Sequence, residues 1–421
     1  MKIVWRIALI SAVVLAFPAG VSATTLEDAI AQALKSNPDV ASAMADLDLA
    51  SARVREAQGA ALPQVSLSGA VGVGRMDLGG FFGFGAAATD PRGAQIELRQ
   101  PLFSGGALRA GIDQARQGRD ASANLTESAR ANLATQVAAA YGGVLAAQSI
   151  CDMVATYVTV TDEIGRQAEQ RFNAGEIPRS ELAQAQARLA DGRAQRASAQ
   201  DVQAVARAQY RAVVGHEPDQ LEPLPHLSSS GLDLEGALDR AQRRNPDLAA
   251  AQAAVRAARD GVRIAEAEHL PSLALTASAA TVRDQFFPGY QSDRTMVGVE
   301  GRWTLFAGGA INARVAQARA VLRKAEANQT RIESAVRQGV IAAWSGVRSA
   351  NEAEFAAADQ LRASGSALDS LRHEVRVGQK STLDLLNAQR DELEARAQYE
   401  RIRVLSVVNA YRLAAMVGEK P

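Results

Sequence analysis

The chain repeats one series of sequence signals twice, and this duplication constrains its fold more than any other feature. An Asn-Pro pair, a Leu-Pro pair and a Gly-Gly pair begin at residues 37, 62 and 105 and again at 245, 270 and 308. The first two signals recur 208 residues later, and the third recurs 203 residues later. Such self-similarity predicts two structural repeats, residues 24–230 and 231–421, that share one order of elements.

Each repeat is expected to contain helices, a β-hairpin and a long helix pair. A short helix ends at the Asn-Pro pair, because proline disfavours helical geometry in the residue before it. A second helix of about 24 residues runs to the Leu-Pro pair. The hairpin and the helix pair then follow, at about 64–103 and 105–214 in the first repeat and at about 272–306 and 308–417 in the second.

The first helix of each pair is expected to be unusually long, from about 108 to 172 and from about 311 to 376. At about 1.5 Å per residue, it would measure close to 100 Å. The return helix of the pair and the helix before the Leu-Pro pair have together nearly the length of this long helix. This match indicates that the long helix packs, as a rod, against the two shorter helices stacked end to end. Aromatic residues make up only 5% of the chain. The predicted fold class is therefore mostly α with a small β part.

The expected strands alternate apolar and polar residues, as Val65 and Leu67 against Ser66 and Ser68 show. The charged residues of the polar faces recur between the repeats and are Glu97, Arg99, Glu300 and Arg302. Such alternation suits a membrane β-barrel with lipid outside and water inside, and it also suits a half-buried soluble sheet. No predicted helix has an apolar face broad enough to cover the strands, which favours the barrel.

Four strands cannot close a barrel, and lipid does not tolerate open strand edges. The chain is therefore expected to oligomerise, since two copies would give eight strands and three would give twelve with an aqueous passage. The four charged residues would then line the lumen or form ladders that only stabilise the barrel. Gly105, Gly106, Gly308 and Gly309 would relax the backbone where each barrel strand turns into a long helix.

The N-terminus has the pattern of an export signal over residues 1–23. Lys2 and Arg6 precede an apolar run that ends in small residues at Ala23, although a retained anchor helix is an alternative. No later run approaches 18 apolar residues. Cys151 is the only cysteine and lies on an apolar stripe, so we expect a small buried hydrophobic residue and no lipid anchor.

Charge and motifs indicate neither an enzyme nor a nucleic-acid-binding protein. The 46 basic and 46 acidic residues cancel, so the chain lacks the basic footprint of a nucleic-acid partner. The four histidines are scattered without ligand spacing. We therefore expect no catalytic site, metal or cofactor.

The duplicated halves, the export signal and the segments "PLFSGG" and "TLFAGG" resemble the TolC family of outer-membrane efflux and secretion channels. The tips "RFNAGEIPRSELAQAQARL" and "VRVGQKSTLDLLNAQRDEL" resemble that family too. The resemblance implies a homotrimer in outer-membrane lipid, with a twelve-stranded β-barrel that continues into a periplasmic α-barrel. It also implies a periplasmic adaptor protein and an inner-membrane ABC transporter or other pump as partners.

The same resemblance implies a pore gate at the periplasmic tips. Lys380 occupies the family's basic position, Asp384 its first acidic position, and Asn387 a position where a second aspartate is common. Asp384 would thus form the one acidic ring of the pore, and the alternative is an ordinary helix-start residue. Ser180 and Glu181 match residues that hold the closed state by bonding to the basic residue and to an aromatic one.

The expected function is a passive exit duct for type I protein secretion or for drug and solute efflux. The absent lipid-anchor cysteine and the two Leu-Phe-x-Gly-Gly turns favour secretion. Two other classes remain open from the sequence. One is a soluble periplasmic adaptor, and the other is a structural coiled-coil protein without a pore.

Overall fold

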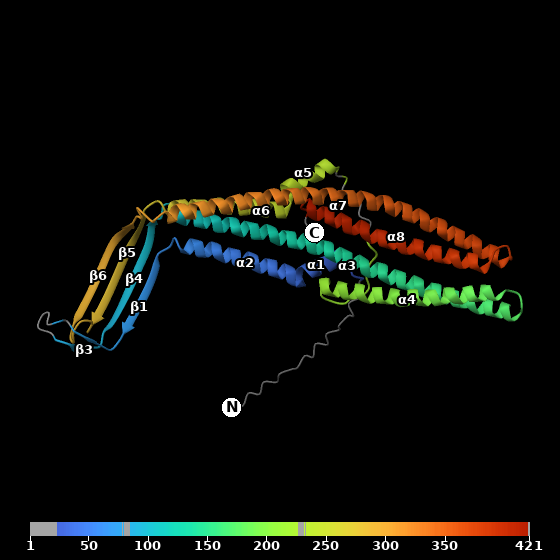
Figure 1. Cartoon of the computed structure of the whole chain (residues 1–421), viewed down its shortest axis with the longest axis horizontal. Coiled ribbons are helices and arrows are strands. Elements are labelled where there is room, and N and C mark those ends of the chain that lie inside the picture. The colour runs from blue at the N-terminus through green and yellow to red at the C-terminus, as the bar shows by residue number, and fades with distance from the viewer. Residues whose placement is uncertain (1–22, 78, 80–84, 226–230, 232, 420–421) are drawn as a thin grey trace, which may run out of the picture.

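The chain is elongated, with a β-sheet at one end and two helix hairpins at the other (Figure 1). The computed structural model describes residues 23–419 except 78, 80–84, 226–230 and 232. The expected signal peptide, apart from its last residue Ala23, therefore lies outside the described residues. The first half forms α1 Leu26–Ser36, α2 Pro38–Gly59, β1 Gln64–Val71, β2 Gly74–Met76, β3 Ala87–Thr89, β4 Arg92–Phe103, α3 Ala107–Asn173 and α4 Arg179–Val214. The second half forms α5 Leu234–Arg244, α6 Pro246–Ala267, β5 Ser272–Arg283, β6 Gln291–Arg302, α7 Ala310–Arg376 and α8 Thr382–Met416.

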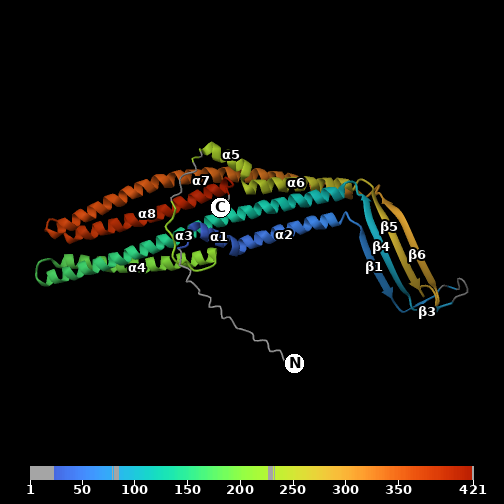
Figure 2. The ribbon, with the colours of Figure 1, turned by 180° about the vertical axis from the view of Figure 1, so that it is seen from behind.

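The long helices α3 and α7 set the dimensions of the molecule. Each has 67 residues and is therefore about 100 Å long. α3 packs against α4 in the half that carries the hairpin tips and against α2 in the half next to the sheet, and α7 packs against α8 and α6 in the same way (Figures 1 and 2). The predicted rod with two stacked shorter helices is confirmed in both halves.

The Asn-Pro pairs do more than separate two helices. Asn37 accepts the Asp39 N–H with its side chain and so caps α2, and Asn245 caps α6 by accepting the Leu248 N–H. The same asparagines donate their amide N–H groups to the carbonyl oxygens at the ends of the return helices, at 3.1 Å for Val213 and 3.0 Å for Met416. Each pair therefore ties a helix start to a helix end that lies far away in sequence.

The largest buried cluster lies in the middle of the helical part, where α1, α3, α4 and the connector between the halves meet. Tyr141 and Tyr210 are fully buried there, with ring centroids 6.5 Å apart. Tyr141 Oη lies 2.8 Å from the Thr24 carbonyl oxygen and 2.7 Å from that of Glu222, so it links the N-terminal segment to the connector. Burial raises the pKa of Tyr141 to about 12.

A second cluster lies nearer the tips, between α3, α4 and α8. Gly192 leaves room there for the ring of Tyr157, because a Cβ at residue 192 would lie 3.1 Å from Tyr157 Cε1. Cys151 packs against this cluster, but it is only partly buried.

One described helix, α3, contains an 18-residue window that is apolar enough to cross a membrane, with a mean hydropathy of 1.4. Half of that window is buried against other helices. Core helices of soluble proteins pass the same test, so the window alone is weak evidence for a membrane span.

The four long strands form one antiparallel sheet in the order β1-β4-β5-β6 (Figure 1). The two hairpins are therefore joined in the middle of the sheet by β4 and β5, which come from different halves. β2 and β3 form a small separate sheet in the loop of the first hairpin, which the alternation pattern did not predict.

The second hairpin is shorter than the sequence predicted. β6 ends at Arg302, which pairs with the first residue of β5, Ser272, so the chain beyond it has no partner strand. Trp303 therefore lies outside the strand, and its Nε1–H donates to the His269 carbonyl oxygen at 3.0 Å. The first hairpin continues to Phe103 only through an irregularity between Pro101 and Phe103, which places Phe103 opposite Leu273.

Candidate functional site

The four charged residues expected in a lumen lie on one face of the sheet. Arg99 is opposite Thr276 on β5, and Glu300 is opposite Ala274 on the same strand. Opposite residues of an antiparallel pair share a face, and residues two apart on one strand do too, so Glu97 and Arg302 belong to this face as well. Arg99 Nη1 lies 3.0 Å from Glu300 Oε2, and both side chains are about half exposed. This face is therefore polar and charged across strands from both halves.

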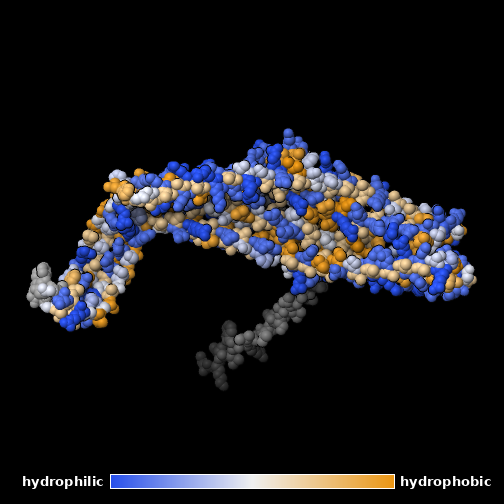
Figure 3. All heavy atoms as spheres, viewed as in Figure 1, coloured by the Kyte–Doolittle hydropathy of each residue, from blue (hydrophilic) through white to orange (hydrophobic). Residues whose placement is uncertain are grey.

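The other face of the sheet is apolar and exposed. Leu67 is 78% exposed and Val297 is 70% exposed. Among the described residues, β1 and β6 each have one edge without a partner strand. Figure 3 shows apolar side chains among polar ones along the sheet and at its junction with the helices. An exposed apolar face between two open edges needs a covering partner or a lipid environment.

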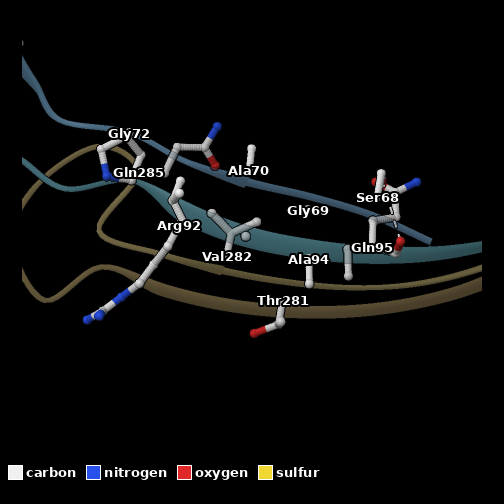
Figure 4. A pocket seen from close by; sticks show the side chains of 14 residues that line it. Ser68, Gly69, Ala70, Gly72, Arg92, Ala94, Gln95, Thr281, Val282 and Gln285 are labelled. Carbon is white, nitrogen blue, oxygen red and sulfur yellow. Dashed lines mark hydrogen bonds between the residues drawn. The ribbon is translucent and has the colours of Figure 1, made fainter.

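Small residues shape the end of the sheet that lies far from the helices. A shallow groove of about 420 Å³ lies there, lined mainly by small side chains of β1, β4 and β5. Figure 4 shows Arg92 and Thr281 pointing to the opposite side of the sheet from Val282. The alternation of faces therefore persists to the end of the strands, where the groove is part of the sheet surface.

The two Gly-Gly turns use the backbone geometry that glycine permits. Gly105, Gly106, Gly308 and Gly309 all have positive φ, between +57° and +91°. Gly106 and Gly309 are the N-caps of α3 and α7. The turns differ in their surroundings, because a Cβ on Gly105 would lie 2.8 Å from the Ala267 carbonyl oxygen, whereas one on Gly308 would meet open space.

The expected gate residues Lys380 and Asp384 stand at the start of α8. Asp384 forms a capping box with Ser381, whose hydroxyl donates to Asp384 Oδ2 at 2.8 Å and whose side chain accepts the Asp384 N–H. The Ser381 hydroxyl and backbone N–H, with the charge of Lys380, hold the pKa of Asp384 below its usual range. Asp384 is therefore ionised at neutral pH and also starts a helix, which keeps both interpretations of this residue open.

The start of α8 is joined to the other hairpin through Asn387. Arg188, on α4, donates from Nη2 to Asn387 Oδ1 at 3.0 Å. Sequence reasoning missed Arg188, because the two residues are 199 positions apart and nothing in the two tip segments indicates that they pair. Only the packing of the two hairpins brings them together.

Ser180 and Glu181 lie in the first turn of α4, at the tip of the other hairpin. Within the described part of the chain, no hydrogen bond or ion pair joins either residue to Lys380 or Asp384. Their expected contact with the basic residue therefore stays a prediction about the assembled protein.

The sequence pattern of the family described as outer membrane efflux protein matches residues 29–216 and 237–419. The chain is 29% identical to outer membrane efflux protein BepC of Brucella suis over 414 residues, which cover 97% of this chain and 88% of BepC. It is 24% identical to outer membrane protein TolC of Escherichia coli over 407 residues, which cover 92% of this chain and 80% of TolC.

Solved structures share the fold. The CmeC outer membrane channel of Campylobacter jejuni superposes with a TM-score of 0.84 over 93% of this chain and 85% of CmeC, at 17% sequence identity. The family match covers both halves, and the neighbour shares the fold over nearly the whole chain. The chain therefore belongs to the outer membrane efflux protein family, the TolC-like channels of the outer membrane with a large periplasmic helical portion.

Proposed function

We propose that three copies of the chain form a passive exit duct across the outer membrane and the periplasm. A periplasmic adaptor and an inner-membrane ABC transporter or other pump would supply the energy and open the mouth. The cargo would be a secreted protein or a small molecule. The name of BepC supports efflux, and the Leu-Phe-x-Gly-Gly turns favour secretion.

The observation that carries this proposal is the two-faced sheet with open edges. Its apolar face suits lipid, its polar face suits water, and β1 of one copy could pair with β6 of the next. Three such sheets supply twelve strands, which leave an aqueous passage, whereas eight strands are filled by side chains. The Arg99–Glu300 pair would then line the lumen.

The helical part supports a long periplasmic tunnel. Helices of about 100 Å leave the sheet at the Gly-Gly turns and end at the hairpin tips, where Lys380 and Asp384 lie. A ring of three Asp384 carboxylates would attract cations at the mouth. Exposed ion pairs contribute only about 0.2–1 kcal/mol each, so such pairs between tips would give a closed state that an adaptor can open.

We also propose the two repeats, residues 24–230 and 231–421, as the structural domains of the duct. Each would contribute one hairpin to the barrel and one helix pair to the tunnel. The alternatives of a soluble adaptor or a coiled-coil structural protein leave the exposed apolar face of the sheet without a role.

Native mass spectrometry of the protein extracted from membranes in mild detergent tests this assembly. We expect three chains held together, followed by ion conductance in a planar bilayer. A protein released from membranes by salt alone as a monomer would contradict the barrel and favour the adaptor.

A further inference from the structure

We propose that Arg188 and Asn387 form a latch that holds the start of α8 against the α3–α4 hairpin and so keeps the tips closed. This inference rests on the proposed channel function and assigns a positioning role to a residue outside the expected gate. Asn387 lies one helical turn after Asp384, so the latch acts directly on the element that carries the acidic ring.

Among the described residues, this hydrogen bond is the only polar side-chain contact between the α3–α4 hairpin and the α7–α8 hairpin. Arg188 Nη2 and Asn387 Oδ1 are 3.0 Å apart and partly buried. No other side-chain hydrogen bond or ion pair among the described residues joins α3 or α4 to α7 or α8. The remaining polar links of α4 stay inside its own hairpin, as Arg193 shows with Asp162 at 3.2 Å.

The interface between the α3–α4 hairpin and the α7–α8 hairpin, here called the seam, changes from apolar in the middle to more polar near the tips. Near the middle it is tight and apolar, because a Cβ on Gly142 would lie 2.8 Å from Val404 Cγ1. Nearer the tips, Gln389 Oε1 is buried without a hydrogen-bond partner in the described structure. Water would satisfy this oxygen if the seam opened, so separation costs less at the tip end than in the middle.

The latch opposes that separation. An arginine bond to an amide oxygen is charge-assisted and therefore stronger than a neutral one. Breaking the latch should leave the middle of the seam intact and release only the tip half.

Single-channel recording in planar bilayers tests the latch. Arg188→Gln replaces the charged guanidinium with a shorter, neutral amide that no longer reaches Asn387, and Asn387→Leu removes the acceptor. We expect each to raise the open probability without adaptor by about tenfold, equivalent to about 1.4 kcal/mol. The double variant should open no more than either single variant, because both break one interaction. Arg193→Gln is the matched control, since it breaks an ion pair within one hairpin, and it should record like wild type.

A distance measurement tests the latch without conductance. Spin labels at Gln184→Cys and Gln379→Cys, both at exposed tip positions in a Cys151→Ala background, report the separation of the tips. Labelled chains diluted into unlabelled ones limit the signal to one subunit. Arg188→Gln should broaden the distance distribution and shift it to longer values, while Arg193→Gln should leave it unchanged.

The outcomes separate the latch from the channel. A conducting wild type with Arg188→Gln and Asn387→Leu indistinguishable from Arg193→Gln would overturn the latch alone. A wild type that never conducts would overturn the proposed function. In that case an unchanged tip distance in Arg188→Gln would overturn the latch as well, and a lengthened one would support it as a structural element.

Discussion

At the residue scale, two neighbouring tyrosines show how differently the same side chain can act in one core. Tyr141 and Tyr210 are both fully buried and lie side by side. The Tyr141 hydroxyl reaches two backbone carbonyl oxygens, whereas the Tyr210 hydroxyl has no hydrogen-bond partner in the described structure. The first hydroxyl therefore stabilises the fold, and the second gains nothing from burial.

Replacing each tyrosine by phenylalanine should separate these effects. Tyr141→Phe should lower the free energy of unfolding by about 1–2 kcal/mol, because it removes the donor to the Glu222 carbonyl oxygen, whereas the Thr24 carbonyl oxygen keeps the Glu222 N–H. Tyr210→Phe, the matched control, should be neutral or slightly stabilising. Thermal unfolding in detergent measures both, and equal losses would contradict the assigned role of the Tyr141 hydroxyl.

The pH dependence of the same pair gives a second check. The pKa of Tyr141 is raised from 10.0 to about 12 in the folded protein. Its contribution is therefore fully present below pH 10 and is lost as the pH rises towards about 12. Tyr141→Phe should lose less stability than wild type over this interval, which thermal unfolding at stepped pH would show.

Asp384 is both a helix-capping residue and the proposed acidic ring. Asp384→Asn keeps a side-chain oxygen for the cap and removes the charge, so we expect several-fold weaker block of conductance by divalent cations. Because the pKa of Asp384 is lowered, the block should be constant from neutral pH to the usual carboxylate range. It should fall only as the pH drops through the lowered pKa.

Asp369→Asn is the control for the acidic ring, because Asp369 is exposed on α7 and pairs with Arg372. It should leave the block unchanged. If Asp384→Asn and Asp369→Asn recorded alike, Asp384 would be a capping residue only.

At the element scale, the Asn-Pro pairs act as joints between helices. The sequence predicted a helix boundary there, which the structure confirms. It gave no sign that each asparagine also binds the end of a return helix, 176 residues away for Asn37 and 171 for Asn245. That contact depends on how the stacked helices meet, which no local pattern encodes.

Substitutions at Asn245 can divide its two contributions. Asn245→Ala should lower the free energy of unfolding by about 2 kcal/mol, since both the cap and the bond to the Met416 carbonyl oxygen are lost. Asn245→Ser keeps a capping oxygen but cannot reach Met416, so it should cost about 1 kcal/mol. Circular dichroism melts in detergent measure the order, and identical melts for the two variants would contradict it.

At the scale of the whole molecule, the repeats make different contacts within one chain. Gly105 packs against Ala267 and Leu270 of the second half, whereas Gly308 faces open space. By the repeat relation, the counterpart of Leu270 is Leu62, which is 60% exposed. In a closed trimer, Gly308 of one subunit would therefore meet Leu62 of the next.

This equivalence predicts two kinds of defect. Gly105→Ala should destabilise the single chain, since a Cβ there adds a clash to the strain of positive φ, about 1–2 kcal/mol. Gly308→Ala should leave the helix content unchanged and reduce the share of trimers in native mass spectrometry. Gly309→Ala is the control. A Cβ on its counterpart Gly106 would meet open space although the second half of the chain packs against the adjacent Gly105, so a Cβ on Gly309 should not disturb the next subunit. Wild-type trimer yield in Gly308→Ala would contradict the equivalence.

By itself the sequence determined the local elements and their periodicity. Backbone geometry and residue pattern act over short distances. They determine the element boundaries at Asn-Pro, Leu-Pro and Gly-Gly, the lengths of the long helices and the two faces of the strands. The end of β6 was not predictable, because it depends on where its partner strand begins.

Only the tertiary structure decided which distant residues meet. Three kinds of contact join segments that sequence patterns treat separately. They are the pairing of β4 with β5, the hydrogen bonds from Asn37 and Asn245 to the ends of the return helices, and the hydrogen bond between Arg188 and Asn387. The physical reason is that a helix or strand fixes its own period through neighbouring residues, whereas partners far apart in the chain are selected by packing.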